Sequence, residues 1–184
     1  MAKLTVFNFI SLDGYYKGLN DDISWNKHNS EEAEFSAGSL QADNMLLFGR
    51  VTYEMMAGFW PTPMAMEKLP KVAAGMNSAE KIVFSTTLKK ADWNNTRVSI
   101  NLIDEVKKLK QTSAKDMTIL GSGSILSQLA SAGLIDTYQV MINPVAIGAG
   151  TPIFKNIKQK LELKLVNTRV FKSGTVLLDY QPMV

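Results

Sequence analysis

Two segments that contain glycine stand where a strand is expected to pass into a helix, and both could bind an anion. The first is Phe48-Gly49-Arg50-Val51-Thr52 and the second is Leu120-Gly121-Ser122-Gly123-Ser124. Glycine lets the backbone come close to a phosphate, and the free N–H groups at the start of a helix attract negative charge. Because ligands of open α/β sheets gather at the carboxyl ends of strands, we expect both turns to face a binding crevice.

Neither turn carries a complete nucleotide-binding signature. Leu126 stands where the dinucleotide-binding fingerprint requires a third glycine, and neither segment matches a P-loop. A glycine at such a turn can also serve the geometry of the turn alone. The prediction of a phosphate site therefore depends on both turns acting together with Arg50.

Hydroxyl and guanidinium groups follow the first turn and a later strand. Arg50 and Thr52 follow the first glycine, and Ser85-Thr86-Thr87 comes at the end of the strand expected next. Their convergence would bind a phosphate monoester, which favours a phosphorylated dinucleotide as the ligand. The alternative is that Arg50 pairs with Glu54 one helical turn later and that the threonine at 86 only caps a turn.

The elements that must position these groups alternate between strands and helices. Strands are expected at residues 3–11, 44–48, 81–85, 117–120 and 138–147. Helices are expected to begin near residues 29–30, 51, 62–63, 101 and 121. Two last strands, 161–171 and 175–180, flank a hairpin turn. This order predicts an α/β fold with a mostly parallel sheet, an antiparallel edge and helices on both faces.

The amino-acid composition limits the classes of protein to which this chain can belong. The 184 residues, 46% hydrophobic and 20% charged, fit one globular domain spanning residues 1–184. The net charge of +3 comes from lysines and arginines dispersed among apolar positions, which is typical of solvated faces. Nucleic-acid binding is not expected, because no segment concentrates positive charge with interleaved aromatic residues.

Cysteine and histidine content exclude several kinds of site. The chain has no cysteine and a single histidine, His28, so thiolate and multi-histidine metal sites are excluded and no metal is expected. His28 itself receives no role. The N-terminus lacks a secretion signal and no apolar run is long enough to span a bilayer, so we expect a cytoplasmic protein without a membrane partner.

Several of these segments resemble one enzyme family. Residues 47–54 resemble the hydrophobic-Gly-Arg-x-Thr-aromatic-Glu signature of dihydrofolate reductases, and residues 81–86 and 119–123 are similar to that family's hydroxyl-ended strand and glycine-rich turn. Residues 11–14 and 133–154 are more similar to the C-terminal reductase domain of the bifunctional riboflavin-biosynthesis enzymes (RibD), which shares that fold. The resemblance spans nearly the whole chain and implies a dihydrofolate reductase-like three-layer α/β/α fold.

The resemblance implies NADPH as the cofactor, held by three sets of residues. Its phosphates or adenosine ribose would meet Gly49, Arg50 and Thr52. Its 2′-phosphate would meet Ser85 and Thr86. Its pyrophosphate and nicotinamide would meet Gly121, Ser122, Gly123 and Ser124. The cofactor performs the hydride chemistry, so the protein need only orient it and supply a proton.

Two acids and a tryptophan are candidates for the substrate side. Asp13 follows the first strand directly and matches the acid of the riboflavin-type motif, although an aspartate beside Gly14 is also typical of a turn. Glu32 is the second catalytic candidate, in a first helical turn where acids commonly offset the helix dipole. Trp25 would line the substrate cleft like the family's loop tryptophan, or would pack in the interior.

The sequence also departs from both families. Ser122 replaces the second of two glycines that dihydrofolate reductases join by a cis peptide, and Gly121 stands where riboflavin reductases carry a glutamate. Dihydrofolate reductases also bind the pterin through a carboxylate of the early helix, for which Glu32 and Glu34 are the nearest candidates, in no clear register. The missing carboxylate argues against folate as the substrate, and the missing glutamate argues against ribosylaminouracil. We predict an NADPH-dependent reductase of another small heterocyclic or unsaturated compound. The alternative is a nucleotide-binding sensor without turnover. The resemblance further implies a homodimer, in which residues 143–150 form either an interface or a buried strand.

Overall fold

The computed structural model describes residues 1–26, 29–41 and 43–183, and His28 lies outside these ranges. The main sheet contains β1 (Leu4–Ser11), β3 (Met45–Gly49), β4 (Lys81–Phe84), β5 (Thr96–Ser99), β6 (Met117–Leu120), β7 (Thr137–Asn143), β9 (Leu163–Val170) and β10 (Val176–Pro182). The α-helices are α1 (Ser30–Gln41), α2 (Arg50–Phe59), α3 (Pro63–Lys68), α4 (Pro70–Ser78), α5 (Leu102–Thr112) and α6 (Gly123–Ser131). Among the described residues, no helix is both long and apolar enough to cross a membrane.

The eight strands have the order β5-β4-β3-β6-β1-β7-β10-β9. The pairs from β5 to β7 are all parallel, whereas β10 runs antiparallel to both β7 and β9. The predicted fold class, a mostly parallel α/β sheet with an antiparallel C-terminal hairpin, is therefore confirmed. In such a sheet β1, β3, β4 and β6 all end at the same edge.

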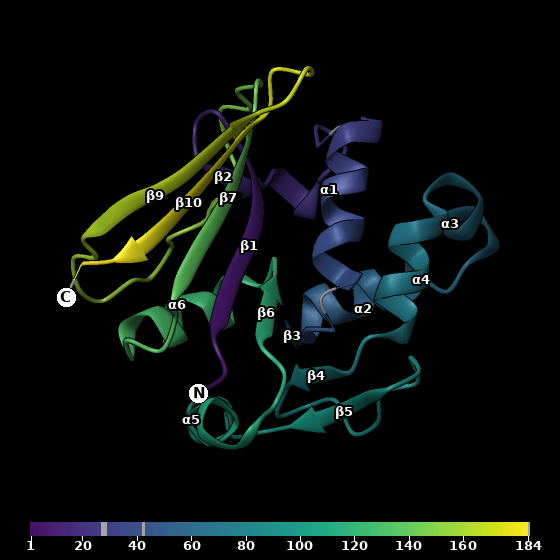
Figure 1. Cartoon of the computed structure of the whole chain (residues 1–184), viewed down its shortest axis with the longest axis vertical. Helices are drawn as coiled ribbons and strands as arrows, with labels where there is room; N and C mark the ends of the chain where they lie inside the picture. The colour runs from purple at the N-terminus through teal and green to yellow at the C-terminus, as the bar shows by residue number, and fades with distance from the viewer. Residues whose placement is uncertain (27–28, 42, 184) are drawn as a thin grey trace.

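Helices cover both faces of the sheet (Figure 1). On one face Leu4 and Val6 of β1 pack in a core with Val106 of α5 and Leu126 of α6. On the other face, a second core joins residues of β3 and β4 to α1, α2 and α4, and a smaller one places Phe7 and Phe171 against Phe35 of α1. This three-layer arrangement leaves the strand ends between α1, α2 and α6 available for a site.

Helix starts agree with the sequence in part. Thr62 caps α3 by accepting a hydrogen bond from the N–H of Ala65 at 3.3 Å, as the Thr62-Pro63 pattern predicts. Asn101 precedes α5, but its side chain makes no capping hydrogen bond. The strand expected over residues 138–147 ends at Asn143, because Pro144 has no N–H with which to continue the ladder.

Three strands were not expected. The edge strand β5 is polar and largely half-buried, so it lacks the apolar run that reveals a strand. In the loop after β1, β2 (Tyr15–Lys17) pairs with β8 (Thr151–Pro152), and a 3-10 turn follows at Leu19–Asp21. The loop is therefore fastened to a segment far along the chain, and this contact fixes where its side chains point.

Candidate functional site

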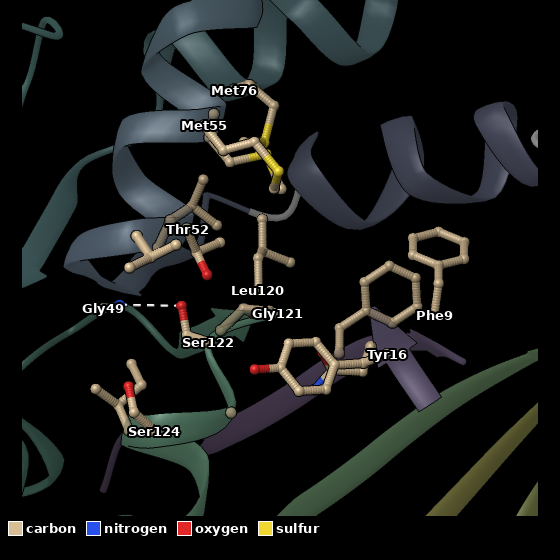
Figure 2. Close-up of a pocket in the computed structure, with 18 of the residues that line it drawn as sticks. Phe9, Tyr16, Gly49, Thr52, Met55, Met76, Leu120, Gly121, Ser122 and Ser124 are labelled. Carbon is tan, nitrogen blue, oxygen red and sulfur yellow. Dashed lines mark hydrogen bonds between the residues drawn. The ribbon is translucent and has the colours of Figure 1, made fainter. Parts of the chain in front are cut away.

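The two glycine turns lie against each other. Because β3 and β6 are parallel neighbours, both turns emerge at one edge, and the N–H of Gly49 donates a hydrogen bond to Oγ of Ser122 at 3.0 Å (Figure 2). A Cβ on Gly49 would lie 3.3 Å from Oγ of Ser124, and a Cβ on Gly121 would lie 3.3 Å from Cγ2 of Thr52. The prediction that the turns come together is confirmed, and only glycine allows this approach without displacing a neighbour.

Both turns open helices whose first N–H groups receive no side-chain cap. Neither α2, which follows Gly49, nor α6, which follows Ser122, has a capping hydrogen bond from the residue before it. Gly121 and Ser122 have φ values of +60° and +56°, the left-handed region that suits glycine and strains serine. The described part of the chain contains no cis peptide bond. Two uncapped helix starts side by side form an anion-binding edge.

A cavity of about 1170 Å³ opens at this edge. Its volume exceeds the range of roughly 300–1,000 Å³ of pockets for single small ligands, so it has room for a cofactor and a second molecule. All nine residues predicted to contact the cofactor line it, namely Gly49, Arg50, Thr52, Ser85, Thr86, Gly121, Ser122, Gly123 and Ser124. We call these residues the turn cradle.

Arg50 and Ser85 also serve the structure around them. Arg50 lines the cavity and donates through Nη1 to both carboxylate oxygens of Glu54, at 3.0 and 2.8 Å. The pairing with Glu54 is therefore present in this structure, and the contact of Arg50 with a phosphate stays a prediction. Oγ of Ser85 accepts the N–H of Thr87 at 3.2 Å and of Leu88 at 2.9 Å, so this hydroxyl caps a turn. Thr86, in contrast, is exposed at the cavity wall.

Asp13 is not among the residues that line the cavity. Its carboxylate accepts the N–H of Ile147 at 3.1 Å and of Gly148 at 2.7 Å. The Ser11 hydroxyl, followed by these backbone N–H groups, lowers the pKa of the Asp13 carboxyl against an opposing effect of desolvation. The geometry therefore favours the structural interpretation, in which Asp13 fastens the loop after β1, and its catalytic role stays a prediction.

Glu32 and Trp25 do not line the cavity either. The Glu32 side chain is 1% exposed, and its Oε1 accepts the hydroxyl of Ser173 from the turn between β9 and β10. Nε1 of Trp25 donates to the carbonyl of Asp22 at 3.2 Å, within its own loop. Neither side chain is placed to contact a ligand in this cavity, so the roles predicted for them also remain predictions.

Tyr16 is a cavity residue that sequence reasoning missed. Its ring lies directly on Gly123, where a Cβ would come within 2.9 Å of both Cε1 and the hydroxyl oxygen. Figure 2 shows the hydroxyl directed toward the turn that carries Gly121 and Ser122. The pairing of β2 with β8, which no local sequence pattern indicates, determines which side chain of the loop after β1 enters the cavity.

Apolar side chains from β1, from three helices and from the junction of α3 and α4 line a further part of the cavity. We call this set the apolar wall, and it consists of Phe9, Leu40, Met56, Leu69, Val72 and Met76. Figure 2 shows Met55 and Met76 on the helices above the turn of Gly121, with Phe9 on the far side of Tyr16. These side chains come from segments far apart in the sequence, so their sharing of one cavity depends on tertiary packing.

The comparisons with known proteins give the chain a family. Residues 2–177 match the RibD C-terminal domain. The uncharacterised Bacillus subtilis protein YyaP is 31% identical over 171 residues, which cover 93% of this chain and 90% of YyaP. A second uncharacterised protein of that organism, YwjB, is 22% identical over 170 residues, 92% of either chain.

Solved structures share the fold. A protein of Shewanella sp. PV-4 provisionally assigned to riboflavin biosynthesis has a TM-score of 0.76 at 19% identity, with full coverage of both chains. The Thermotoga maritima diaminohydroxyphosphoribosylaminopyrimidine deaminase/5-amino-6-(5-phosphoribosylamino)uracil reductase has a TM-score of 0.67 at 13% identity, and the match covers 99% of this chain and 57% of that one. At these identities the structures support the fold alone. The match over residues 2–177 shows that this chain belongs to the family of RibD C-terminal domains.

Proposed function

We propose that this protein is an NADPH-dependent reductase of a small heterocyclic or unsaturated compound. The observation that carries the proposal is the hydrogen bond from Gly49 to Ser122, which joins two uncapped helix starts at the edge of one cavity. Membership of a reductase-like family supports the same chemistry. The cavity volume of about 1170 Å³ accommodates a dinucleotide together with a substrate.

The residues of the turn cradle fit a phosphorylated dinucleotide. When bound, NADPH would supply the hydride. The first N–H groups of α2 and α6 would hold its phosphates, and Arg50 with Thr86 would hold the additional 2′-phosphate. Arg50 now pairs with Glu54, but both side chains are nearly half exposed, and releasing an exposed ion pair costs only about 0–1 kcal/mol.

Within this proposal, the Tyr16 hydroxyl donates the proton that the substrate takes up when it is reduced. The titratable side chains among the described residues that line the cavity are Tyr16, Lys17, Asp21 and Arg50. Lys17 and Asp21 are engaged with each other, and Arg50 belongs to the turn cradle. The Tyr16 hydroxyl lies against Gly123, beside the place proposed for the reacting end of the cofactor. Its neighbour Lys17 holds its Nζ 5.7 Å from the Tyr16 ring centroid.

Thermal unfolding of the full chain with NADPH, NADH or FMN tests the cofactor. A ligand at a hundred times its Kd stabilises a protein by about 2.7 kcal/mol, or roughly 5–11 °C in Tm for a chain of this size. NADPH should give this shift at a lower concentration than NADH. Arg50→Met should weaken NADPH about tenfold to a hundredfold, with little effect on NADH. The control Lys90→Met changes an exposed lysine outside the cavity. Equal shifts with NADPH and NADH, or none, would refute the proposal.

A nucleotide sensor without turnover is the second candidate. The observation that favours it is that neither Asp13 nor Glu32, the two acids predicted to be catalytic, lines the cavity. A sensor would bind NADPH with the same dependence on Arg50 but would oxidise none of it with any member of a substrate panel. Stopped-flow absorbance at the NADPH band separates the two candidates, because turnover alone consumes the cofactor.

A further inference from the structure

The charges that the described residues bring to the cavity are either paired or belong to the turn cradle. Among the described residues that line it, Lys17 and Asp21 form an ion pair with each other, so their charges cancel. Arg50 is the remaining charged residue, and it lies at the start of α2 among the proposed cofactor contacts. Away from the turn cradle, no unpaired positive charge is available in the described lining to receive a phosphate or a carboxylate.

The apolar wall offers dispersion contacts in place of charge. Phe9 from β1, Leu40 from α1 and Met56 from α2 face the same cavity as Val72 and Met76 from α4. Aromatic and methionine side chains adapt to flat apolar ligands, and burying an anion against them without a partner is strongly unfavourable. The wall therefore selects a ligand that carries no charge where it contacts these residues.

Polar atoms on the same cavity lack partners among the residues that the structure describes. The amide nitrogen of Asn8, the amide oxygen of Asn26 and the hydroxyl of Ser36 are buried and make no hydrogen bond with this part of the chain, and all three residues line the cavity. Asn8 is only 3% exposed. A buried polar atom without a partner destabilises a fold, so unpaired atoms gathered around one cavity indicate a ligand that supplies their partners. All of these groups are neutral, and they suit carbonyl, amide or hydroxyl groups.

We propose that the substrate is an uncharged, unphosphorylated and largely apolar flat molecule that carries neutral polar groups. Its ring would lie against the apolar wall, and its polar groups would reach the unpaired atoms of Asn8, Asn26 and Ser36. This inference rests on the proposed function, because it assigns the turn cradle to the cofactor and the remaining cavity to the substrate. The ligand chemistry differs from that of the phosphoribosyl compound in the name of the Thermotoga relative.

A matched pair of probes tests the inference: 2-naphthol and 2-naphthyl phosphate, which share a ring and differ by the phosphate. Each is titrated by calorimetry into the full chain, with and without saturating NADPH. With the turn cradle filled, 2-naphthol should bind at least about tenfold more tightly than the phosphate. Equal or tighter binding of 2-naphthyl phosphate in the presence of NADPH would overturn the inference.

Single substitutions in the cavity lining test whether 2-naphthol binds there. Ser36→Ala removes a hydroxyl that has no partner among the described residues, so it should leave Tm unchanged or raise it while weakening 2-naphthol about twofold to tenfold. Asn8→Ala should weaken the probe in the same way. The matched control is Ser78→Ala, an exposed serine of α4 outside the cavity, which should leave probe affinity unchanged. If Ser36→Ala and Asn8→Ala both bind 2-naphthol like the wild type, the unpaired atoms do not serve a ligand.

Failure of this inference differs from failure of the proposed function. If NADPH does not bind, the cofactor assignment fails, yet the two probes and the Ser36 variant still measure the charge preference of the apolar wall. If NADPH binds and is oxidised faster with 5-amino-6-(5-phosphoribosylamino)uracil or dihydrofolate than with uncharged quinones and enones, the reductase stands and the uncharged substrate is refuted.

Discussion

The Ser122 hydroxyl joins the two turns, and its removal tests whether this hydrogen bond builds the site. Ser122 is 4% exposed, and its Oγ accepts the N–H of Gly49 at 3.0 Å. Ser122→Ala leaves that N–H buried without its partner, which destabilises the fold by about 1–3 kcal/mol. For a chain of this size each kcal/mol lowers Tm by roughly 2–4 °C, so we expect a fall of about 2–12 °C.

A glycine at the same position separates the hydrogen bond from the backbone strain. Ser122 has φ of +56° and ψ of +58°, a left-handed conformation that costs a residue with a Cβ about 1–2 kcal/mol. Ser122→Ala keeps this strain and loses the bond, whereas Ser122→Gly loses both. We therefore expect Ser122→Gly to be more stable than Ser122→Ala by about 1–2 kcal/mol, with NADPH affinity reduced in both variants.

Urea and thermal unfolding followed by circular dichroism measure both differences. Ser131→Ala is the control, because Ser131 lies exposed on the same helix and its hydroxyl bonds only the carbonyl of Ser127. This control should stay within about 0.5 kcal/mol of the wild type. The reasoning is refuted if Ser122→Ala is as stable as the wild type, or if Ser122→Gly is the less stable of the two variants.

Other substitutions test the proposed proton donor, the two predicted catalytic acids and a buried lysine. Tyr16→Phe should lower kcat about a hundredfold or more without changing the Kd of NADPH, and unchanged kcat would exclude its hydroxyl as the proton donor. Asp13→Asn keeps an amide oxygen that can still accept the N–H of Gly148, and Glu32→Gln changes a residue outside the cavity lining, so both variants should keep wild-type turnover. A large loss of kcat at unchanged Tm would restore the catalytic role predicted for either acid. Burial lowers the pKa of Lys81 from 10.5 to about 8, so between these pH values the unfolded chain binds more protons than the folded one. Stability measured by urea unfolding should therefore rise with pH in that window relative to Lys81→Met, and a flat or falling difference would contradict the shift.

The turn cradle was predictable from the sequence because its geometry is local. A glycine directly after an apolar run ends a strand and starts a helix, and parallel strands bring such ends to one edge. Hence all nine predicted cofactor contacts line one cavity. The order of neighbouring strands, which places β3 beside β6, required the whole fold.

The substrate side of the cavity was not predictable from the sequence, because contacts with residues far along the chain orient its side chains. Asp13 turns toward Ile147 and Gly148, more than a hundred residues away, and Glu32 turns toward Ser173. Each acid occupies a plausible position in the sequence, yet a partner in the C-terminal half of the chain directs it away from the cavity. Tyr16 enters the cavity for the converse reason, since β8 holds its strand in place.

Within this family, cofactor binding should depend on local segments of sequence, and substrate specificity on packing between distant segments. The turn cradle is formed by short segments at the ends of β3, β4 and β6, so the same local sequence can rebuild it in any relative with this sheet. Most of the apolar wall comes from α1, α2 and α4, whose positions over the sheet depend on many packed side chains. A change in α1, in α4 or in the later turns of α2 alters the substrate surface and leaves the first turn of α2 and the start of α6 intact. Relatives with the same glycine turns and a differently charged wall are therefore expected to share a cofactor and to reduce different compounds.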